Sequence, residues 1–125
     1  MNLEEWSKIP TFNLPTSSGK KVKLSEIKSE NVVIYFYPKD DTPGCTNQAK
    51  DFSKLKAKFS KKNTEIIGIS PDSMEKHKKF IDKYNLKITL LSDEDKKISL
   101  KFSVWKEKSL YGKKYMGIER TTFLI

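Results

Sequence analysis

Short apolar runs and helical repeats alternate along the first half of the chain. Residues 32–37 and 64–70 are rich in β-branched and aromatic side chains, which predicts two buried strands. The segment between them, to about Lys61, carries apolar residues at helical spacing: Ala49, Phe52, Leu55 and Phe59. A helix that joins two buried strands predicts a right-handed βαβ unit with parallel strands.

The second half predicts two further helices. Residues 71–73 begin a helical pattern that reaches Tyr84, where Asn85 can end the helix. Asp93 begins another predicted helix. The residues of these helices that are expected to face inward are apolar or aromatic: Phe80, Ile81, Tyr84, Ile98 and Phe102.

Both ends of the chain predict strands. The turn-forming residues 17–20 are expected to join residues 11–14 and 21–23 in a hairpin, and Ser25 to cap a short turn after it. Residues 120–125 form a last apolar run, which predicts a final strand. The pattern as a whole indicates an α/β protein.

The loop between the first buried strand and its helix contains Cys45, the only cysteine of the chain. Pro43 favours a helix start because it has no N–H group to leave unpaired. Cys45 therefore falls in the first helical turn, where unpaired N–H groups and the helix dipole favour a thiolate over a thiol. This position predicts a nucleophilic cysteine.

A lone cysteine can instead be a small buried residue that only packs. The neighbouring residues argue against that interpretation, because Asp40, Asp41, Thr42 and the Pro43-Gly44 pair are typical of a surface loop. We therefore expect Cys45 to lie in such a loop and to have a chemical role.

The loop and its flanks carry a family resemblance. Residues 36–46, FYPKDDTPGCT, resemble the active-site signature of the peroxiredoxins, thiol peroxidases with a thioredoxin-like fold, and in particular their Q or bacterioferritin comigratory protein branch. Other segments resemble further landmarks of the family: 10–15, 68–72, 90–93 and 119–125. The resemblance covers residues 1–125 and implies a single thioredoxin-like domain with an N-terminal hairpin.

The resemblance implies roles for four residues. Cys45 matches the peroxidatic cysteine, which attacks the O–O bond of the peroxide. Thr42 matches the residue whose hydroxyl bonds the reacting oxygens, and Pro38 matches the proline that shields the pocket from water. Arg120 matches the arginine that supports the thiolate and the peroxide; taken alone, its place before a strand would indicate only a surface charge. Fixed donors suit this reaction because both the sulfur and the leaving oxygen carry negative charge.

Two positions depart from the family pattern. Many members of the branch carry a resolving cysteine five positions after the peroxidatic one, but this chain has Lys50 there and no second cysteine. An internal disulfide is therefore impossible, and an external thiol or the Cys45 of another molecule must react with the Cys45 sulfenic acid. Gln48 replaces a frequent glutamate and is expected to act in a capping box with Cys45 or Thr46.

Composition narrows the class of protein further. A chain of 125 residues with 33% charged and 36% hydrophobic residues is expected to form one globular domain. No stretch approaches the ~20 apolar residues that span a bilayer, and residues 1–6 do not resemble a secretory signal. One unpaired cysteine fits a reducing compartment, so the cytoplasm is expected, with the nucleus or an organelle left open.

The net charge of +9 does not by itself predict nucleic-acid binding. The lysines occur as scattered pairs rather than one long run: 20–21, 61–62, 78–79, 96–97 and 113–114. His77 has no metal-ligand companion in the pattern and is expected at the surface or half-buried. We expect neither a metal nor a cofactor.

The chain stops at Ile125 inside an apolar run, whereas family members continue with a further antiparallel strand and a C-terminal helix. The sequence is therefore expected to be truncated, with an uncovered sheet edge that favours association. We expect a monomer or a weak homodimer.

The resemblance implies a one-cysteine thiol peroxidase that reduces hydrogen peroxide and alkyl hydroperoxides and serves antioxidant defence. Glutathione with glutaredoxin, or thioredoxin, is the expected reductant. A thiol-disulfide oxidoreductase normally needs a Cys-x-x-Cys pair, which Gln48 does not supply. A non-catalytic binding or chaperone-like domain with the same fold is the remaining alternative.

Overall fold

The computed structural model describes residues 12–110 and 112–124 and is built around a four-stranded sheet in the order β5-β4-β3-β8. Strands β3, β4 and β5 run parallel, and β8 runs antiparallel to β3. The strands of this sheet are β3 (Asn31–Phe36), β4 (Thr64–Ser70), β5 (Thr89–Ser92) and β8 (Thr121–Leu124). The predicted βαβ unit is confirmed, because β3 and β4 are parallel neighbours joined by one helix.

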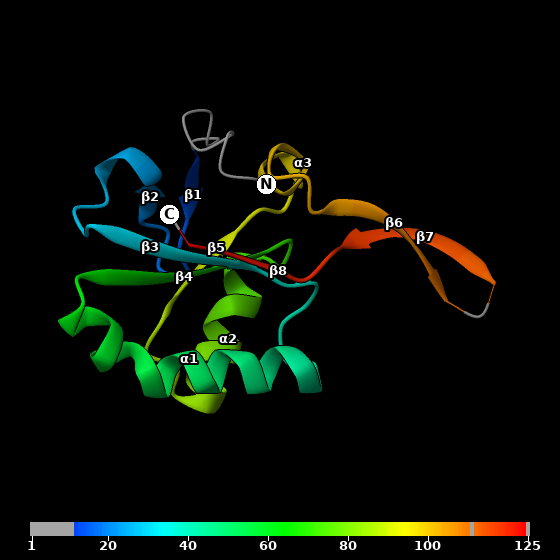
Figure 1. Cartoon of the computed structure of the whole chain (residues 1–125). Coiled ribbons are helices and arrows are strands. Elements are labelled where there is room, and N and C mark those ends of the chain that lie inside the picture. The colour runs from blue at the N-terminus through cyan, green and yellow to red at the C-terminus, as the bar shows by residue number, and fades with distance from the viewer. Residues whose placement is uncertain (1–11, 111, 125) are drawn as a thin grey trace.

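Helices α1 (Pro43–Lys61) and α2 (Met74–Tyr84) lie on one face of the sheet (Figure 1). The hairpin of β1 (Asn13–Pro15) and β2 (Lys21–Lys23) and the short helix α3 (Lys97–Lys101) lie on the other face. None of the helices in the described ranges is long and apolar enough to cross a membrane.

Strand β3 serves both cores because its side chains alternate between the two faces of the sheet. Three of them join the cluster that contains residues of β1 and α3: Val32, Ile34 and Phe36. Val33 and Tyr35, together with Tyr37 after the strand, join the cluster under α1 and α2, which includes Cys45, Ala49 and Phe80. A strand buried on both faces explains why the sequence shows a continuous apolar run here.

The ends of α1 and α2 follow local signals in the sequence. Pro43 occupies the first turn of α1 as predicted, and Thr42 is the N-cap residue, although its side chain makes no capping hydrogen bond. In α2, the Ser73 hydroxyl accepts from the N–H of Lys76, and Asn85 ends the helix in the left-handed region with φ 52°. These ends were predictable because each depends on neighbouring residues only.

Two local predictions were wrong. Helix α3 begins at Lys97 rather than Asp93, because Lys96 is left-handed with φ 63°. Asp93 instead accepts from the N–H groups of Ile98 and Ser99 through its buried carboxylate. The short 3-10 helix Leu24–Glu26 is preceded by Lys23 and contains Ser25, so Ser25 is not its cap.

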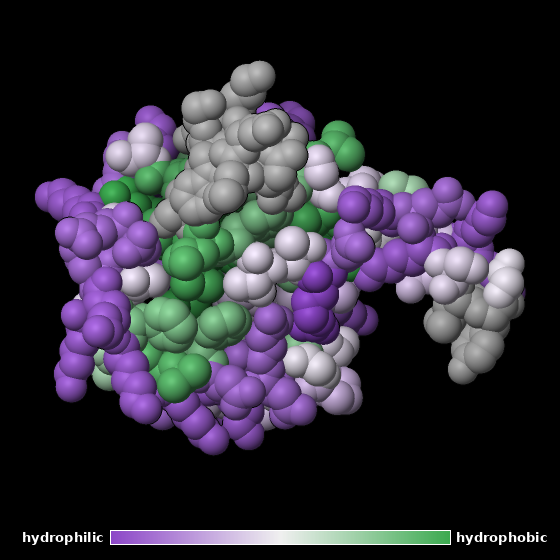
Figure 2. All heavy atoms as spheres, viewed as in Figure 1, coloured by the Kyte–Doolittle hydropathy of each residue, from purple (hydrophilic) through white to green (hydrophobic). Residues whose placement is uncertain are grey.

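The sequence pattern also missed a hairpin. Strands β6 (Trp105–Leu110) and β7 (Lys113–Ile118) pair antiparallel and project from the body of the molecule (Figure 1). Most of their described side chains are exposed, and Figure 2 shows mainly hydrophilic residues on this projection. Only the base of this hairpin joins the core, through Ile118 and the partly buried Trp105. The exposed remainder produces no apolar alternation, which is why the pattern gave no signal for it.

Candidate active site

Cys45 lies in the first turn of α1, as predicted, but it is not on the surface. Its side chain is 1% exposed and packs in the cluster with Tyr35, Tyr37 and Ala49. The expectation of a surface loop holds for Asp41, Pro43 and Gly44, which are exposed, and fails for Asp40, which is buried. The loop is polar at its outer face, while the helix start turns the thiol toward the sheet.

Arg120 approaches Cys45 although the two residues are far apart in the sequence. Its Nη2 atom donates to Cys45 Sγ at 3.1 Å, and its Nη1 atom donates to Gln48 Oε1 at 2.7 Å. The antiparallel pairing of β8 with β3 brings the start of β8, next to Arg120, to the end of β3 that leads to Cys45. A guanidinium at this distance stabilises negative charge on the sulfur.

Gln48 has a different contact from the one expected. It forms no capping box with Cys45 or Thr46, because its amide oxygen accepts the hydrogen bond from Arg120. Gln48 lies one helical turn after Cys45, so both residues present their side chains to the same guanidinium. Gly44 also lies close to the guanidinium, since a Cβ there would lie 3.4 Å from Nη2.

Thr42 and Pro38 lie in the same loop, but among the described hydrogen bonds neither residue bonds the sulfur. The Thr42 hydroxyl donates to the carbonyl oxygen of Lys39 at 3.1 Å, so its hydrogen is directed away from Sγ in this structure. Pro38 directly follows Tyr37 and is exposed. Of the four residues named from the sequence, the structure joins Cys45 and Arg120 by a direct hydrogen bond.

Two buried tyrosines line the inner side of the site. Burial raises the pKa of Tyr35 far above its ordinary value, and the charges of Asp40 and Cys45 raise it further. Burial likewise raises the pKa of Tyr37, with the charge of Asp40 as the next cause. Both phenols therefore stay protonated and neutral and add no negative charge beside the sulfur.

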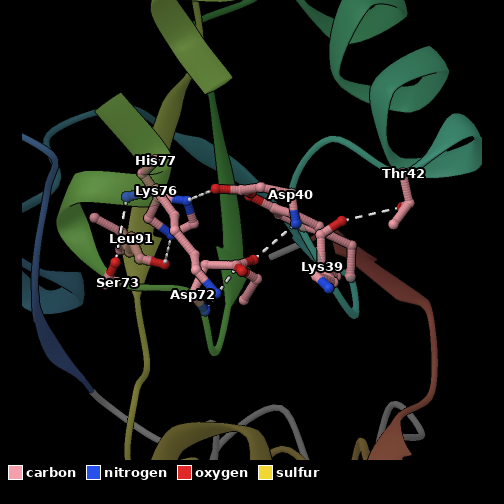
Figure 3. Close-up of polar contacts among 10 residues, drawn as sticks. Lys39, Asp40, Thr42, Asp72, Ser73, Lys76, His77 and Leu91 are labelled. Carbon is pink, nitrogen blue, oxygen red and sulfur yellow. Dashed lines mark hydrogen bonds and ion pairs between the residues drawn. The ribbon is translucent and has the colours of Figure 1, made fainter. Parts of the chain in front are cut away.

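His77 is the clearest correction to the sequence analysis. It was expected at the surface or half-buried, but it is 0% exposed and bonded at both ring nitrogens. Figure 3 shows its ring between Asp40, from the loop before α1, and Leu91 from β5. The helical pattern did not predict this burial, because the hydrogen-bond partners of the His77 ring, Asp40 and Leu91, come from other elements.

Asp40, Asp72 and His77 form a buried group of metal-ligand types whose ligand atoms lie within 4.8 Å of one another. Both ring nitrogens of His77 and both carboxylate oxygens of Asp40 are already engaged in hydrogen bonds within the protein. These contacts satisfy the polar atoms without an ion. We therefore treat this group as a hydrogen-bond network.

A groove of about 410 Å³ opens beside the helix start. Phe52 and Leu55 supply apolar surface, and Arg120 and Gln48 stand at its polar side. Arg120 lines this groove and also bonds Cys45. Small molecules can therefore approach the guanidinium from the groove.

Comparison with known proteins places these features in context. Residues 7–125 match the AhpC/TSA family. The chain is 50% identical to peroxiredoxin Bcp of Bacillus subtilis over 125 residues, which is all of this chain and 80% of that protein. It is 45% identical to peroxiredoxin Bcp of Escherichia coli over 116 residues, which is 93% of this chain and 74% of that protein.

Solved structures give the same result. The bacterioferritin comigratory protein of Xanthomonas campestris, described for its alkyl peroxide reduction activity, has a TM-score of 0.85 and 42% identity. That match covers 91% of this chain and 73% of the other. Peroxiredoxin Q of Xylella fastidiosa, solved as a cysteine-to-serine mutant, has a TM-score of 0.87 and 35% identity over 100% of this chain and 75% of the other.

Proposed function

The chain belongs to the AhpC/TSA family, as a peroxiredoxin of the Bcp or Q branch with the expected thioredoxin-like fold, and from that premise we propose how its residues carry the reaction. It is a thiol-dependent peroxidase, and its substrates are a hydroperoxide and a thiol reductant. The observation that carries our assignment of residues is the 3.1 Å contact between Arg120 Nη2 and Cys45 Sγ.

In the first step, the Cys45 thiolate attacks one oxygen of the hydroperoxide. An S–O bond forms as the O–O bond breaks, so the sulfur is oxidised by two electrons and becomes a sulfenic acid. The departing oxygen leaves as alkoxide or hydroxide and takes up a proton to give an alcohol or water. Arg120 stabilises charge on the sulfur before attack and on the oxygens as the bond breaks.

Thr42 and Pro38 complete the site in this proposal. The Thr42 hydroxyl now bonds the Lys39 carbonyl, and rotation about its side chain would let it donate to a bound peroxide. Pro38 adds an apolar surface without an N–H group at the loop, and we assign it the role of limiting water at the sulfur. Gln48 holds the guanidinium of Arg120 in place.

The second step requires a thiol from outside the chain, because Cys45 is the only cysteine. The thiol sulfur attacks the sulfenic sulfur, water leaves, and a mixed disulfide forms. A second thiol then attacks the mixed disulfide and releases Cys45 as a thiol. We propose glutathione with glutaredoxin as the reductant, and thioredoxin as the alternative.

We further propose that the protein works in a reducing compartment, the cytoplasm in the first instance, as a monomer or weak homodimer. The support is chemical: a single free thiol keeps its reactive form where other thiols are reduced. Sedimentation over a range of concentrations tests the second part of this proposal.

Intact mass after one equivalent of hydrogen peroxide, with and without a dimedone-type trap, tests the proposed role of Cys45. We expect the mass of one added oxygen without the trap and of one trap adduct with it. Cys45→Ser is the control and should show neither. An oxidation or adduct that persists in Cys45→Ser, or a parent chain that takes up no oxygen, would contradict the assignment.

A further inference from the structure

The contacts of His77 fix where its hydrogens must lie. Its Nε2 atom lies 3.0 Å from the carbonyl oxygen of Leu91, and its Nδ1 atom lies 2.6 Å from Asp40 Oδ2. A carbonyl oxygen only accepts, so Nε2 carries a hydrogen. Two lone pairs facing each other at the second contact would repel, so that contact also contains a hydrogen. His77 and Asp40 therefore hold one proton between them, on the ring or on the carboxyl group.

Asp40 is held by groups from three parts of the fold. Its Oδ1 atom accepts from the Tyr37 hydroxyl at 2.6 Å, and its N–H donates to Asp72 Oδ2 at 2.8 Å. Tyr37 is a dependable donor because burial raises its pKa, and Asp72 Oδ2 is itself fixed by the Ser70 hydroxyl at 2.7 Å. His77 from α2 supplies the contact at the remaining carboxylate oxygen (Figure 3).

This anchor lies directly before the catalytic helix. Asp40 precedes the N-cap residue Thr42 and the helix that carries Cys45. The first turn is closed by the bond from the Thr46 N–H to the Thr42 carbonyl oxygen at 2.8 Å. A shift of Asp40 therefore moves Thr42 and the helix start, and small displacements of a reacting group reduce rates by up to roughly a hundredfold.

We propose that His77 is a positioning residue of the peroxide step: the proton that it holds against Asp40 keeps the loop from Asp40 to Thr42 where it sets Cys45 beside Arg120. This inference rests on the proposed role of Cys45. The inference assigns a function to the buried hydrogen bonds around Asp40 and His77, none of which involves the sulfur.

A second consequence concerns the reduction of Cys45. The side chain is 1% exposed, so an external thiol reaches the sulfenic sulfur only after the first turn of α1 opens. A weaker anchor should therefore slow the peroxide step and speed the reduction step. A uniform loss of stability gives no reason for opposite effects on the two steps.

Two substitutions of His77 separate its contacts. In His77→Asn the side-chain amide can still donate toward Asp40, whereas in His77→Gln it can donate toward Leu91 but not toward Asp40. Asp40→Asn tests the same contact from the other side, since its amide can donate to a neutral Nδ1 atom. Ser99→Ala is a matched control, because it removes another buried hydrogen bond to a carboxylate, at Asp93, on the opposite face of the sheet.

The experiment measures the rate of Cys45 oxidation by hydrogen peroxide, the rate of sulfenic acid reduction by glutathione, and the amide exchange of Thr46. We expect His77→Gln to slow oxidation by about ten- to a hundredfold, to speed reduction, and to raise Thr46 exchange more than exchange in β4. His77→Asn and Asp40→Asn should each lose less of the parent's oxidation rate than His77→Gln does. The parent should show a far-downfield, exchange-protected ring N–H resonance that His77→Gln lacks.

Three results would overturn the inference. They are an unchanged oxidation rate in His77→Gln, a Thr46 exchange that rises only in step with β4, and a Ser99→Ala variant that behaves like His77→Gln. Amide exchange and the ring resonance do not depend on peroxide chemistry. They therefore decide whether His77 anchors the helix start even if Cys45 itself proves unreactive, which would contradict only the proposed function.

Discussion

At the scale of single residues, the chemistry of the site depends on the hydrogen bond from Arg120 to the sulfur. Arg120 is the charged group that donates to Cys45 Sγ within the described residues, and Gln48 fixes its other nitrogen. Arg120 is itself exposed, so solvent weakens its attraction for the thiolate. Arg120 therefore offers the sulfur two things: a positive charge, which solvent screens, and a donor that Gln48 holds in a fixed geometry.

Replacing Arg120 should separate these two contributions. We expect Arg120→Met to slow peroxide oxidation of Cys45 by roughly a hundredfold, the usual effect of losing one fixed donor. Arg120→Lys should restore only part of the rate, because an ammonium group cannot bond Cys45 and Gln48 in one plane. Stopped-flow oxidation measures both. Lys113→Met, which removes the same charge from the exposed β7, is the control and should be oxidised at the parent's rate. If Arg120→Met were also oxidised at the parent's rate, Arg120 would have no part in the site.

The proposed role of Thr42 depends on its hydroxyl rather than on its shape. Thr42→Val should therefore slow the peroxide step by about ten- to a hundredfold while the melting temperature stays close to that of the parent. Thr42→Ser keeps the donor and should retain most of the rate. The rate constant for oxidation and the thermal midpoint, measured on the same samples, check this. Equal oxidation rates for threonine and valine would argue that the hydroxyl takes no part.

At the scale of elements, α2 holds the loop before α1 through two separate contacts. One is the buried bond between His77 and Asp40, near the start of the helix. The other is exposed and lies at its end, where Asp41 accepts from Lys83 at 2.8 Å and from Tyr84 at 2.6 Å. Helix α2 therefore supports the loop that precedes α1 without contributing a group to the sulfur.

The exposed contact predicts a dependence on pH. The hydrogen bond from Lys83 lowers the pKa of Asp41, and the Tyr84 hydroxyl lowers it further. A carboxyl whose pKa is lowered by folding adds stability above its unfolded value, about 3.9, and loses that contribution as the pH falls through the folded value. Asp41→Asn should thus be less stable than the parent near neutral pH, by a small amount because the pair is exposed.

Urea unfolding of the parent and Asp41→Asn, near neutral pH and near pH ~3, measures this difference. The two midpoints should approach each other in acid. Asp82→Asn on the exposed side of α2 serves as the control, since Asp82 makes none of the described ion pairs. A gap between the parent and Asp41→Asn that widens in acid would contradict the assigned pair.

At the scale of the whole molecule, one thiol per chain decides which oxidised products form. Lys50 lies five positions after Cys45, where many members of the family carry a resolving cysteine. Its Nζ atom lies 5.8 Å from the centroid of the Tyr84 ring. The sulfenic acid must therefore meet a second molecule, either a thiol or more peroxide. Excess peroxide without thiol should carry Cys45 on to the sulfinic acid.

A second cysteine should change that outcome. Lys50→Cys should divert the oxidised product to an internal disulfide and improve turnover with thioredoxin. Residues five apart do not face each other on a helix, so this bond requires α1 to unwind locally. Mass after peroxide, before and after alkylation, distinguishes the products. A parent chain that turns over with thioredoxin and forms neither a mixed nor an intermolecular disulfide would show that the one-cysteine mechanism is wrong.

The sequence by itself determined the features that depend on neighbouring residues. The apolar runs predicted β3 and β4, the helical repeat predicted α1, and Ser73 and Asn85 marked the ends of α2. The first-turn position of Cys45 followed in the same way, because Pro43 and the repeat after it define where the helix starts. These features are local in the chain, and their physical causes are backbone geometry and periodic burial.

Tertiary structure alone decided which distant residues meet. The pairing of β8 with β3 brought Arg120 to Cys45, and only then did Gln48 gain its partner. The burial of His77 likewise depends on Asp40 and Leu91, which come from other elements. A polar side chain is buried only where partners from elsewhere satisfy its hydrogen bonds, and no local pattern along the chain records those partners.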